Sequence, residues 1–183
     1  TTSVTAAINS GSFGSLGGNT IKQASQGVIT FTDLTLAGRV SENYKLRFSS
    51  GSLVVADSNN VTVTPGAPST ATSLVSSAVT SLVAETTNTT TVTITLKDAQ
   101  GNLLTTGGAA VGLAVSPVTS GFTDLGNVGS VTDRSNGTYT ATYTAGTKVQ
   151  SVRFSATLGG VAITDTSQLS LTHGAAYQIA VQT

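Results

Sequence analysis

The chain has 183 residues, enough for one or two domains of ordinary size. Only 9% of the residues are charged, and eight basic and eight acidic side chains cancel to a formal net charge of zero, which argues against a nucleic-acid binder or a polybasic membrane module. The absence of cysteine excludes disulfides, thiolate metal sites and thiol nucleophiles. With 34 Thr, 23 Ser and 20 Gly beside 38% hydrophobic residues, we expect a folded, threonine-rich, all-β protein.

Alternation of apolar and polar residues, the signature of strands with one buried face, recurs along the chain. In chain order the alternating positions are Val4, Ala6 and Ile8; Tyr44, Leu46 and Phe48; Val92, Ile94 and Leu96; Val111, Leu113 and Val115; Tyr139, Ala141 and Tyr143; Val152, Phe154, Ala156 and Leu158; and Leu169 and Leu171. The segment 71–85 comes nearest to a helical pattern, but its Thr and Val content favours an edge strand. Turn signals separate these runs, namely SSG at 49–51, DAQGN at 98–102, TTGG at 105–108, DRSNG at 133–137 and LGG at 158–160. Short strands at this spacing predict antiparallel sandwiches.

The sequence also contains an internal repeat. Residues 46–67 align with residues 152–175, and the offset between the two copies is about 106 to 108 residues. We therefore expect two sandwiches, the second with about seven strands between residues 70 and 172. The segment TPGAPS at 64–69 would join them, because Pro65 and Pro68 cannot donate to a strand ladder and restrict the hinge.

The same alignment predicts how much of each copy is present. The first copy has no counterpart of residues 66–107, so residues 1–65 are expected to form a sandwich that lacks its opening strands. Residues 66–172 would form a complete sandwich. Residues 174–183 align with residues 66–75, so the segment 173–183 would be the first strand of a further repeat or a donor strand.

Two longer runs carry a resemblance to a known family. The run TTNTTTVTITLKDAQGNLL at 86–104, followed by VTDRSNGTYTATYTA at 131–145, resembles the bacterial Ig-like repeat of the invasin and intimin type. Residues 14–36, 44–53 and 61–69 are similar to another Ig-like repeat, found in tandem in very large bacterial surface proteins. The resemblance implies tandem Ig-like antiparallel β-sandwiches, an extracellular location at the cell surface, and a non-enzymatic role as stalk, adhesin spacer or filament component.

Few residues offer site chemistry. Asp98 with Asn102, and Asp133 with Asn136, could supply oxygen ligands to calcium, but neither pair has D-x-D-x-D spacing, and each lies in a turn that contains a glycine, Gly101 or Gly137. We therefore interpret both as turn residues and expect no metal and no cofactor. His173 aligns with the first copy's linker, which predicts a solvated linker histidine. The sequence contains neither a G-x-S-x-G motif nor a pair of carboxylates beside aromatic residues, so it gives no indication of an enzyme.

Two kinds of covalent modification are also considered. Asn60, Asn88 and Asn136 stand in glycosylation sequons, which would matter only in a host that glycosylates surface proteins. An intramolecular isopeptide or ester crosslink would need a Lys facing an Asn, or a Thr facing a Gln, inside the core. Lys45 and Lys97 lie in predicted strands but alternate with apolar neighbours, so both are expected to point outward.

Two functions remain open. The first is a subunit of a surface filament or stalk, in which Tyr177, Ile179 and Val181 enter the incomplete first sandwich of a neighbouring copy and so build a head-to-tail homopolymer. The second is an Ig-like spacer or ligand-binding fragment of a large bacterial adhesin, with surface glycans or a host cell surface as partner. Five Phe, four Tyr and no Trp leave little for sugar stacking, which favours the first. No nucleic-acid partner and no membrane insertion are expected, since no stretch approaches ~20 continuous apolar residues.

Overall fold

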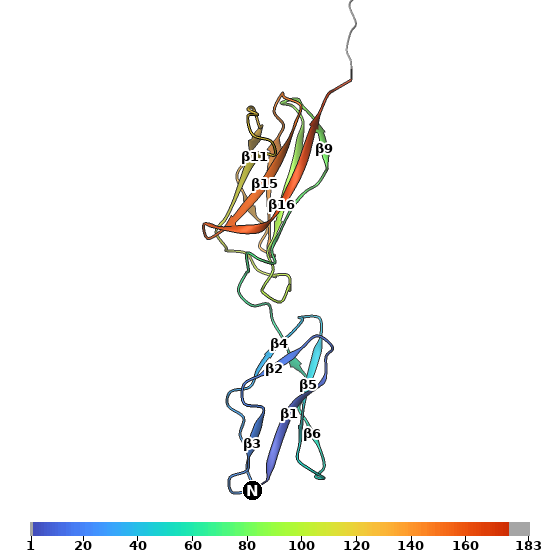
Figure 1. Ribbon diagram of the computed structural model, residues 1–183, viewed down its shortest axis with the longest axis vertical. Helices are drawn as coiled ribbons and strands as arrows, with labels where there is room; N and C mark the ends of the chain where they lie inside the picture. The colour runs from blue at the N-terminus through green and yellow to red at the C-terminus, as the bar shows by residue number, and fades with distance from the viewer. Residues whose placement is uncertain (1, 176–183) are drawn as a thin grey trace, which may run out of the picture. The chain divides into compact units, whose positions relative to one another are not determined.

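The computed structural model describes residues 2–175, and every regular element among these residues is a β-strand (Figure 1). The all-β expectation is therefore confirmed. The chain divides into two compact units, Thr1–Pro65 (unit 1) and Gly66–Thr183 (unit 2), which are described separately. Within residues 2–175 no helix is long and apolar enough to cross a membrane.

Unit 1 is built around two antiparallel strands that the alternation predicts. Its strands are β1 (Ser3–Ser10), β2 (Ser15–Gly17), β3 (Ile21–Gln23), β4 (Thr35–Ala37), β5 (Asn43–Ser49), β6 (Ala56–Asp57) and β7 (Val61–Thr62). The main sheet has the order β3-β1-β5-β6, with β7 also paired to β5, while β2 and β4 form a separate ribbon. Ala6 lies opposite Phe48 and Ile8 opposite Leu46, and a bulge follows Ile8.

The core of unit 1 is small. Among its described residues, Ala6 and Tyr44 are the buried apolar side chains. The Tyr44 ring lies against three glycines, Gly11, Gly14 and Gly38, where a Cβ atom would overlap the ring. Its hydroxyl accepts a hydrogen bond from the backbone N–H of Arg39 at 2.8 Å. Unit 1 thus depends on one tyrosine that fits only because its neighbours have no side chains.

Unit 2 has two facing sheets, which make a β-sandwich. Its strands are β8 (Leu74–Ser77), β9 (Ser81–Val83), β10 (Thr89–Thr95), β11 (Val111–Pro117), β12 (Asn127–Val128), β13 (Thr132–Asp133), β14 (Thr138–Thr144), β15 (Gln150–Leu158) and β16 (Val161–Thr172). One sheet has the order β12-β14-β10-β8, with β13 also paired to β14, and the other has the order β11-β15-β16-β9 (Figure 1). The described region of unit 2 thus has nine strands where about seven were expected. The segment 71–85 divides into two strands, and the long loop before β14 contains two short ones.

The segment 71–85 joins the two sheets of unit 2. Its first part, β8, pairs antiparallel with β10, and its second part, β9, pairs parallel with β16. β8 and β9 each lie at the edge of their sheet, so the predicted edge position is confirmed. Among the described strands, β9 and β16 pair in parallel, because a strand that changes sheets meets the last strand of the unit running in the same direction. The other strand pairs of unit 2 are antiparallel, as expected.

The core of unit 2 is formed by the alternating residues. The largest fully buried apolar side chains are Val92, Ile94, Leu96, Tyr143, Val152, Phe154, Leu169 and Leu171. The rings of Tyr143 and Phe154 meet edge to face, with centroids 4.9 Å apart and an interplanar angle of 74°. Such a pair adds to the stabilisation that burial already provides. The sandwich therefore rests on one continuous apolar layer between the sheets.

We expect Phe154→Ala to lower the free energy of unfolding of unit 2 by about 3–5 kcal/mol, because the change removes a fully buried ring and leaves a cavity. The measurement is equilibrium denaturation followed by circular dichroism. Phe122→Ala is the matched control, since Phe122 is 45% exposed and its loss should change stability by no more than ~0.5 kcal/mol. A loss below ~1 kcal/mol for Phe154→Ala would contradict the proposed core.

Candidate functional site

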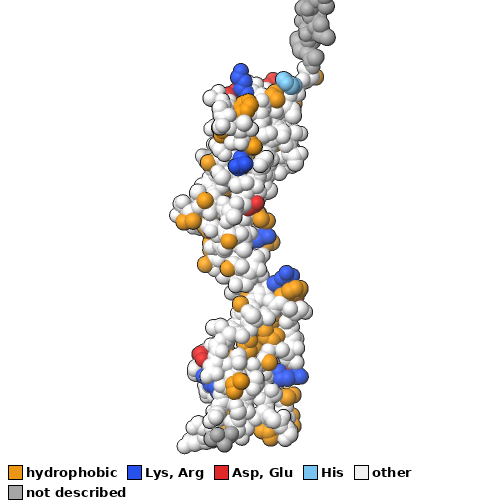
Figure 2. All heavy atoms as spheres, viewed as in Figure 1, with side chains coloured by type: hydrophobic (Ala, Val, Ile, Leu, Met, Phe, Trp, Pro, Cys, Tyr) orange, Lys and Arg blue, Asp and Glu red, His pale blue; other side chains and the backbone are white. Residues whose placement is uncertain are grey.

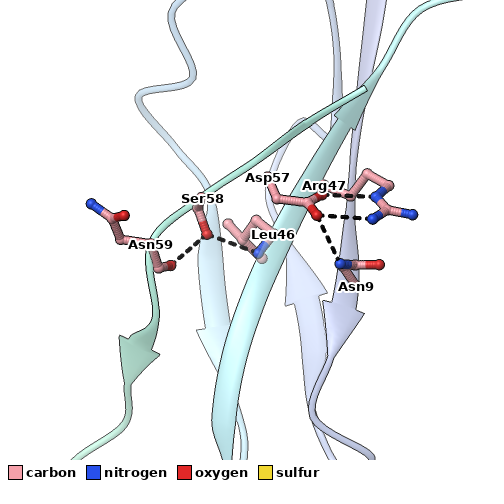
Figure 3. Close-up of polar contacts among 6 residues, drawn as sticks. All are labelled: Asn9, Leu46, Arg47, Asp57, Ser58 and Asn59. Carbon is pink, nitrogen blue, oxygen red and sulfur yellow. Dashed lines mark hydrogen bonds and ion pairs between the residues drawn. The ribbon is translucent and has the colours of Figure 1, made fainter. Parts of the chain in front are cut away.

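The first polar cluster lies on unit 1, between β5 and β6 (Figure 3). Arg47 donates from Nε to Asp57 Oδ1 at 2.7 Å and from Nη2 to Oδ2 at 2.8 Å, and Asn9 Nδ2 donates to Oδ2 at 3.1 Å. The hydrogen bonds from Arg47 hold the pKa of the Asp57 carboxyl below its ordinary value. Arg47 and Asp57 face each other across the two strands. This cluster therefore aligns β6 with β5, and both carboxylate oxygens of Asp57 already accept hydrogen bonds.

The second cluster surrounds Asp98, which lies shortly after the end of β10 and two residues after the buried Leu96. Asp98 Oδ1 accepts hydrogen bonds from the N–H groups of Gln100 at 3.0 Å and Asn102 at 2.9 Å. Asp98 Oδ2 accepts from Asn102 Nδ2 and from the N–H of Gly66, both at 2.9 Å. The turn expected from DAQGN is present, and the Gly66 contact is additional. Asp98 thus ties the start of unit 2 to the end of β10.

More hydrogen bonds secure the same segment. The Thr72 hydroxyl donates to the Asp98 carbonyl at 2.7 Å, and the Ser69 N–H donates to the Lys97 carbonyl at 2.8 Å. Ser73 Oγ donates to the Ser69 carbonyl at 2.7 Å and accepts from the Lys97 N–H at 3.1 Å. We call Asp98, together with Gly66, Ser69, Thr72 and Ser73, the linker clasp. It fixes residues 66–73 on unit 2 through polar contacts.

The Asp98 carboxyl is almost completely buried, at 2% exposure. Burial alone would raise its pKa, but the hydrogen bonds from Gly66, Asn102 and Gln100 outweigh burial and hold the pKa below the ordinary value. A carboxylate in this environment is charged at neutral pH and has its oxygens occupied by N–H donors. Its role in the structure is that of an anchor for backbone amides.

The remaining acidic turns are also internally satisfied. Asp133 accepts from the N–H groups of Gly108 at 2.6 Å and Ser135 at 2.7 Å. Asn136 accepts from the N–H of Thr138 at 3.1 Å, so Asp133 and Asn136 serve separate turns. Across residues 2–175 no three His, Cys, Asp or Glu side chains lie close enough to hold a metal ion.

Three further residues considered from the sequence have clear positions. His173 is exposed just after β16, as expected for a linker histidine. Lys45 is exposed and Lys97 is half-buried, and neither belongs to the buried core. Tyr177, Ile179 and Val181 lie outside the described residues, so their insertion into a neighbouring copy stays a prediction.

An apolar groove on unit 1 is the feature best suited to an interaction. Its volume is about 430 Å³, and it is lined by Val4, Ile29, Thr30, Phe31, Leu34 and Phe48. The rings of Phe31 and Phe48 lie 5.4 Å apart, and both are half-buried. Sequence reasoning identified Val4 and Phe48 as strand residues but missed Phe31, because the segment 28–34 forms no regular strand. Figure 2 shows that charged side chains are sparse among the hydrophobic ones on the visible surface.

We expect Asp98→Ala to lower the free energy of unfolding of unit 2 by about 3 kcal/mol, because several buried amides lose a charged acceptor. Asp98→Asn supplies the pH test. Since the pKa of Asp98 is lowered on folding, its contribution is present above the unfolded pKa of ~4 and is lost as the pH falls through the folded pKa. The stability difference between the wild type and Asp98→Asn should therefore shrink on acidification in thermal melts. A difference that stays constant or grows would contradict the anchoring role.

Metal removal gives another prediction. Because the oxygens of Asp98 and Asp133 are occupied by N–H donors, extensive chelation should leave the melting temperature unchanged. Differential scanning calorimetry with and without chelator checks this. A fall of ~10 °C or more would identify a bound cation that the geometry does not explain.

Comparison with solved structures shows the fold. An Escherichia coli adhesin, FdeC, is 23% identical with a TM-score of 0.52, over 93% of this chain and 52% of FdeC. InvD of Yersinia pseudotuberculosis is also 23% identical with a TM-score of 0.51, over 100% of this chain and 50% of InvD. The chain thus spans about half the length of both, and the expected Ig-like sandwich architecture is confirmed.

Comparison of the sequence with known families is more specific. No curated protein matches the sequence significantly. A family model described as invasin, domain 3, matches residues 69–174, which is more than half of the chain and almost all of the described part of unit 2. The expected resemblance to the invasin and intimin type is thereby confirmed, and the chain belongs to the invasin domain 3 family.

Proposed function

We propose that the chain is a non-enzymatic, extracellular segment of a bacterial surface adhesin, in which Ig-like sandwiches are arranged in series. The observation that carries this proposal is the family match over residues 69–174. FdeC, one of the structurally similar proteins, is described as an adhesin. In this role the sandwiches act as spacers that hold other parts of the adhesin away from the cell.

The polar clusters support a structural role rather than catalysis. The carboxylates of Asp57, Asp98 and Asp133 accept hydrogen bonds from neighbouring N–H groups or from Arg47. A catalytic acid or base must instead exchange a proton with a substrate within hydrogen-bond reach. His173, the single histidine of the chain, is exposed beside the last strand and has no acidic partner among the described contacts. The three carboxylates therefore stabilise turns and strand pairs.

The location can be tested with antibodies raised against the chain. If the proposal is right, intact cells that produce the protein should be labelled in immunogold electron microscopy without permeabilisation. An antibody against a cytoplasmic protein is the control and should label permeabilised cells alone. Labelling by both antibodies only after permeabilisation would refute the extracellular location.

A second candidate function is favoured by the apolar groove of unit 1. The groove exposes parts of Val4, Phe31 and Phe48, and unit 1 has few buried apolar side chains of its own. An extended segment with apolar residues at every second position would cover such a groove by strand addition. The segment 174–183 of another copy has this pattern at Tyr177, Ile179 and Val181. Assembly would then be head to tail, with each chain donating this segment and accepting another in unit 1.

We expect Ile179→Asp to abolish multimers in light scattering, because a charge cannot enter the apolar groove without a partner. Deletion of residues 176–183 should have the same effect. Leu103→Asp is the matched control, since Leu103 is 57% exposed on unit 2 and should leave assembly unchanged. Circular dichroism should show the same strand content for all variants. Assembly of the shortened chain, or a wild type that stays monomeric at high concentration, would remove this candidate and leave the spacer proposal standing.

A further inference from the structure

The chain enters and leaves unit 2 at opposite ends of the strand β10. At the entering side, Gly66 is bound to Asp98, which lies just after the end of β10. At the leaving side, Thr172 lies opposite Val83. The Val83 carbonyl accepts a hydrogen bond from Asn88 Nδ2 at 3.3 Å, and Asn88 directly precedes β10. Tension along the chain would therefore act across the whole length of this strand.

The last strand of unit 2 is held by the parallel strand β9. The paired residues are Ser81 with Ser170, Leu82 with Leu171 and Val83 with Thr172. Hydrogen bonds continue on both sides of this pairing, from the Ser170 N–H to the Thr80 carbonyl at 3.0 Å and from the Ala84 N–H to the Thr172 carbonyl at 2.9 Å. Leu171 is buried in the core, so the same strand is also held by its side chain. We call the pairing of residues 80–84 with residues 170–172 the β9–β16 clamp.

The parallel direction determines how tension would act on this clamp. A pull on the preceding chain draws β9 toward its own N-terminus, and a pull on the following chain draws β16 toward its C-terminus. Because the two strands run in the same direction, these forces are opposed and lie along the strand axis. All hydrogen bonds across the pair are then loaded together. In a hairpin pulled open from its ends, by contrast, the bonds break one after another at lower force.

The entering side is secured before tension reaches β9. A pull on the linker first meets the linker clasp, where the buried Asp98 carboxylate holds the Gly66 N–H. It next meets β8, whose pairing with β10 places Val75 opposite Ile94 in the core. Unit 2 therefore unfolds under force only when these contacts or those of the β9–β16 clamp break. Neither contact depends on unit 1 or on self-assembly.

We propose that unit 2 is a tension-bearing module, with the β9–β16 clamp as the element that resists unfolding under force. This function goes beyond that of a passive spacer, because it concerns what the sandwich withstands as well as the distance it spans. Unit 1 supplies an internal reference in the same chain, since it buries only Ala6 and Tyr44 among its described apolar residues. At the same force, unit 2 unfolds more slowly than unit 1.

Single-molecule force spectroscopy on the full chain tests this function. The chain contains no cysteine, so cysteines added at both ends give unique attachment points. Unfolding of unit 2 is recognised by the larger extension step, because it contains more residues than unit 1. Ala84→Pro removes the N–H that donates to Thr172. The change suits the local backbone, since Ala84 is the central residue of a tight turn closed by the Glu85 N–H and the Val83 carbonyl at 2.8 Å.

At a fixed force, Ala84→Pro should raise the unfolding rate of unit 2 about fivefold, which corresponds to the loss of one ordinary hydrogen bond. Val118→Pro is the matched control. It removes the Val118 N–H that donates to Ser151 at 3.0 Å, in the same sheet but beside the edge strand β11. Val118→Pro should leave the rate under force unchanged, although both variants lower the melting temperature. Equal acceleration by the two variants, or no acceleration by Ala84→Pro, would overturn the clamp.

A change of pulling direction gives a test that does not depend on the folding of either proline variant. Lys148→Cys moves the second attachment point to an exposed turn at the same end of unit 2, where the Ala145 N–H donates to the Asn88 carbonyl. Tension then bypasses the C-terminal end of β16. Unit 2 should unfold faster at the same force than when it is pulled through residue 183. An equal or slower rate would refute the β9–β16 clamp, while leaving the surface location of the chain untouched.

Discussion

Burial of one face of each strand is the constraint on which both units depend. In unit 2, apolar residues at every second position of β10, β14, β15 and β16 meet in one layer, so the two sheets hold each other. In unit 1 the same alternation in β1 and β5 buries far fewer side chains, and the large buried one among its described residues is Tyr44, whose ring packs against glycines. Threonine occupies many of the outward positions, where its branched side chain suits a strand without adding charge.

Polar contacts then decide how the ends of unit 2 are held. The Asp98 carboxylate anchors Gly66 on the entering side, and the parallel β9 holds Thr172 on the leaving side. Both devices use backbone amides, which every residue except proline supplies. The result is a sandwich whose two chain ends are each fixed at the point where they leave it. This arrangement agrees with a unit that is repeated in series in a surface protein.

The sequence predicts the strands that alternate strictly and the turns that carry glycine, because both depend on local chemistry. It also predicts the family, since the runs at 86–104 and 131–145 that carry the resemblance lie within the matched residues 69–174. Long-range features are missed: Gly66 lies 32 positions from Asp98, and the paired residues of β9 and β16, such as Ser81 and Ser170, are 89 positions apart. The apolar groove is missed for a different reason, because Phe31 lies in a segment without periodicity. Such contacts follow from the packing of the sheets rather than from any one stretch of sequence.

Native-state amide hydrogen exchange, resolved to single residues by NMR, tests most directly the claim that unit 2 is a β-sandwich held at both chain ends. The amides of Ile94 and Phe154 should exchange only through global unfolding, and the Gly66 amide should be protected although it belongs to the linker. The amides of unit 1 should exchange faster than those of the unit 2 core. Rapid exchange at Gly66, together with equal protection of the two units, would contradict the account.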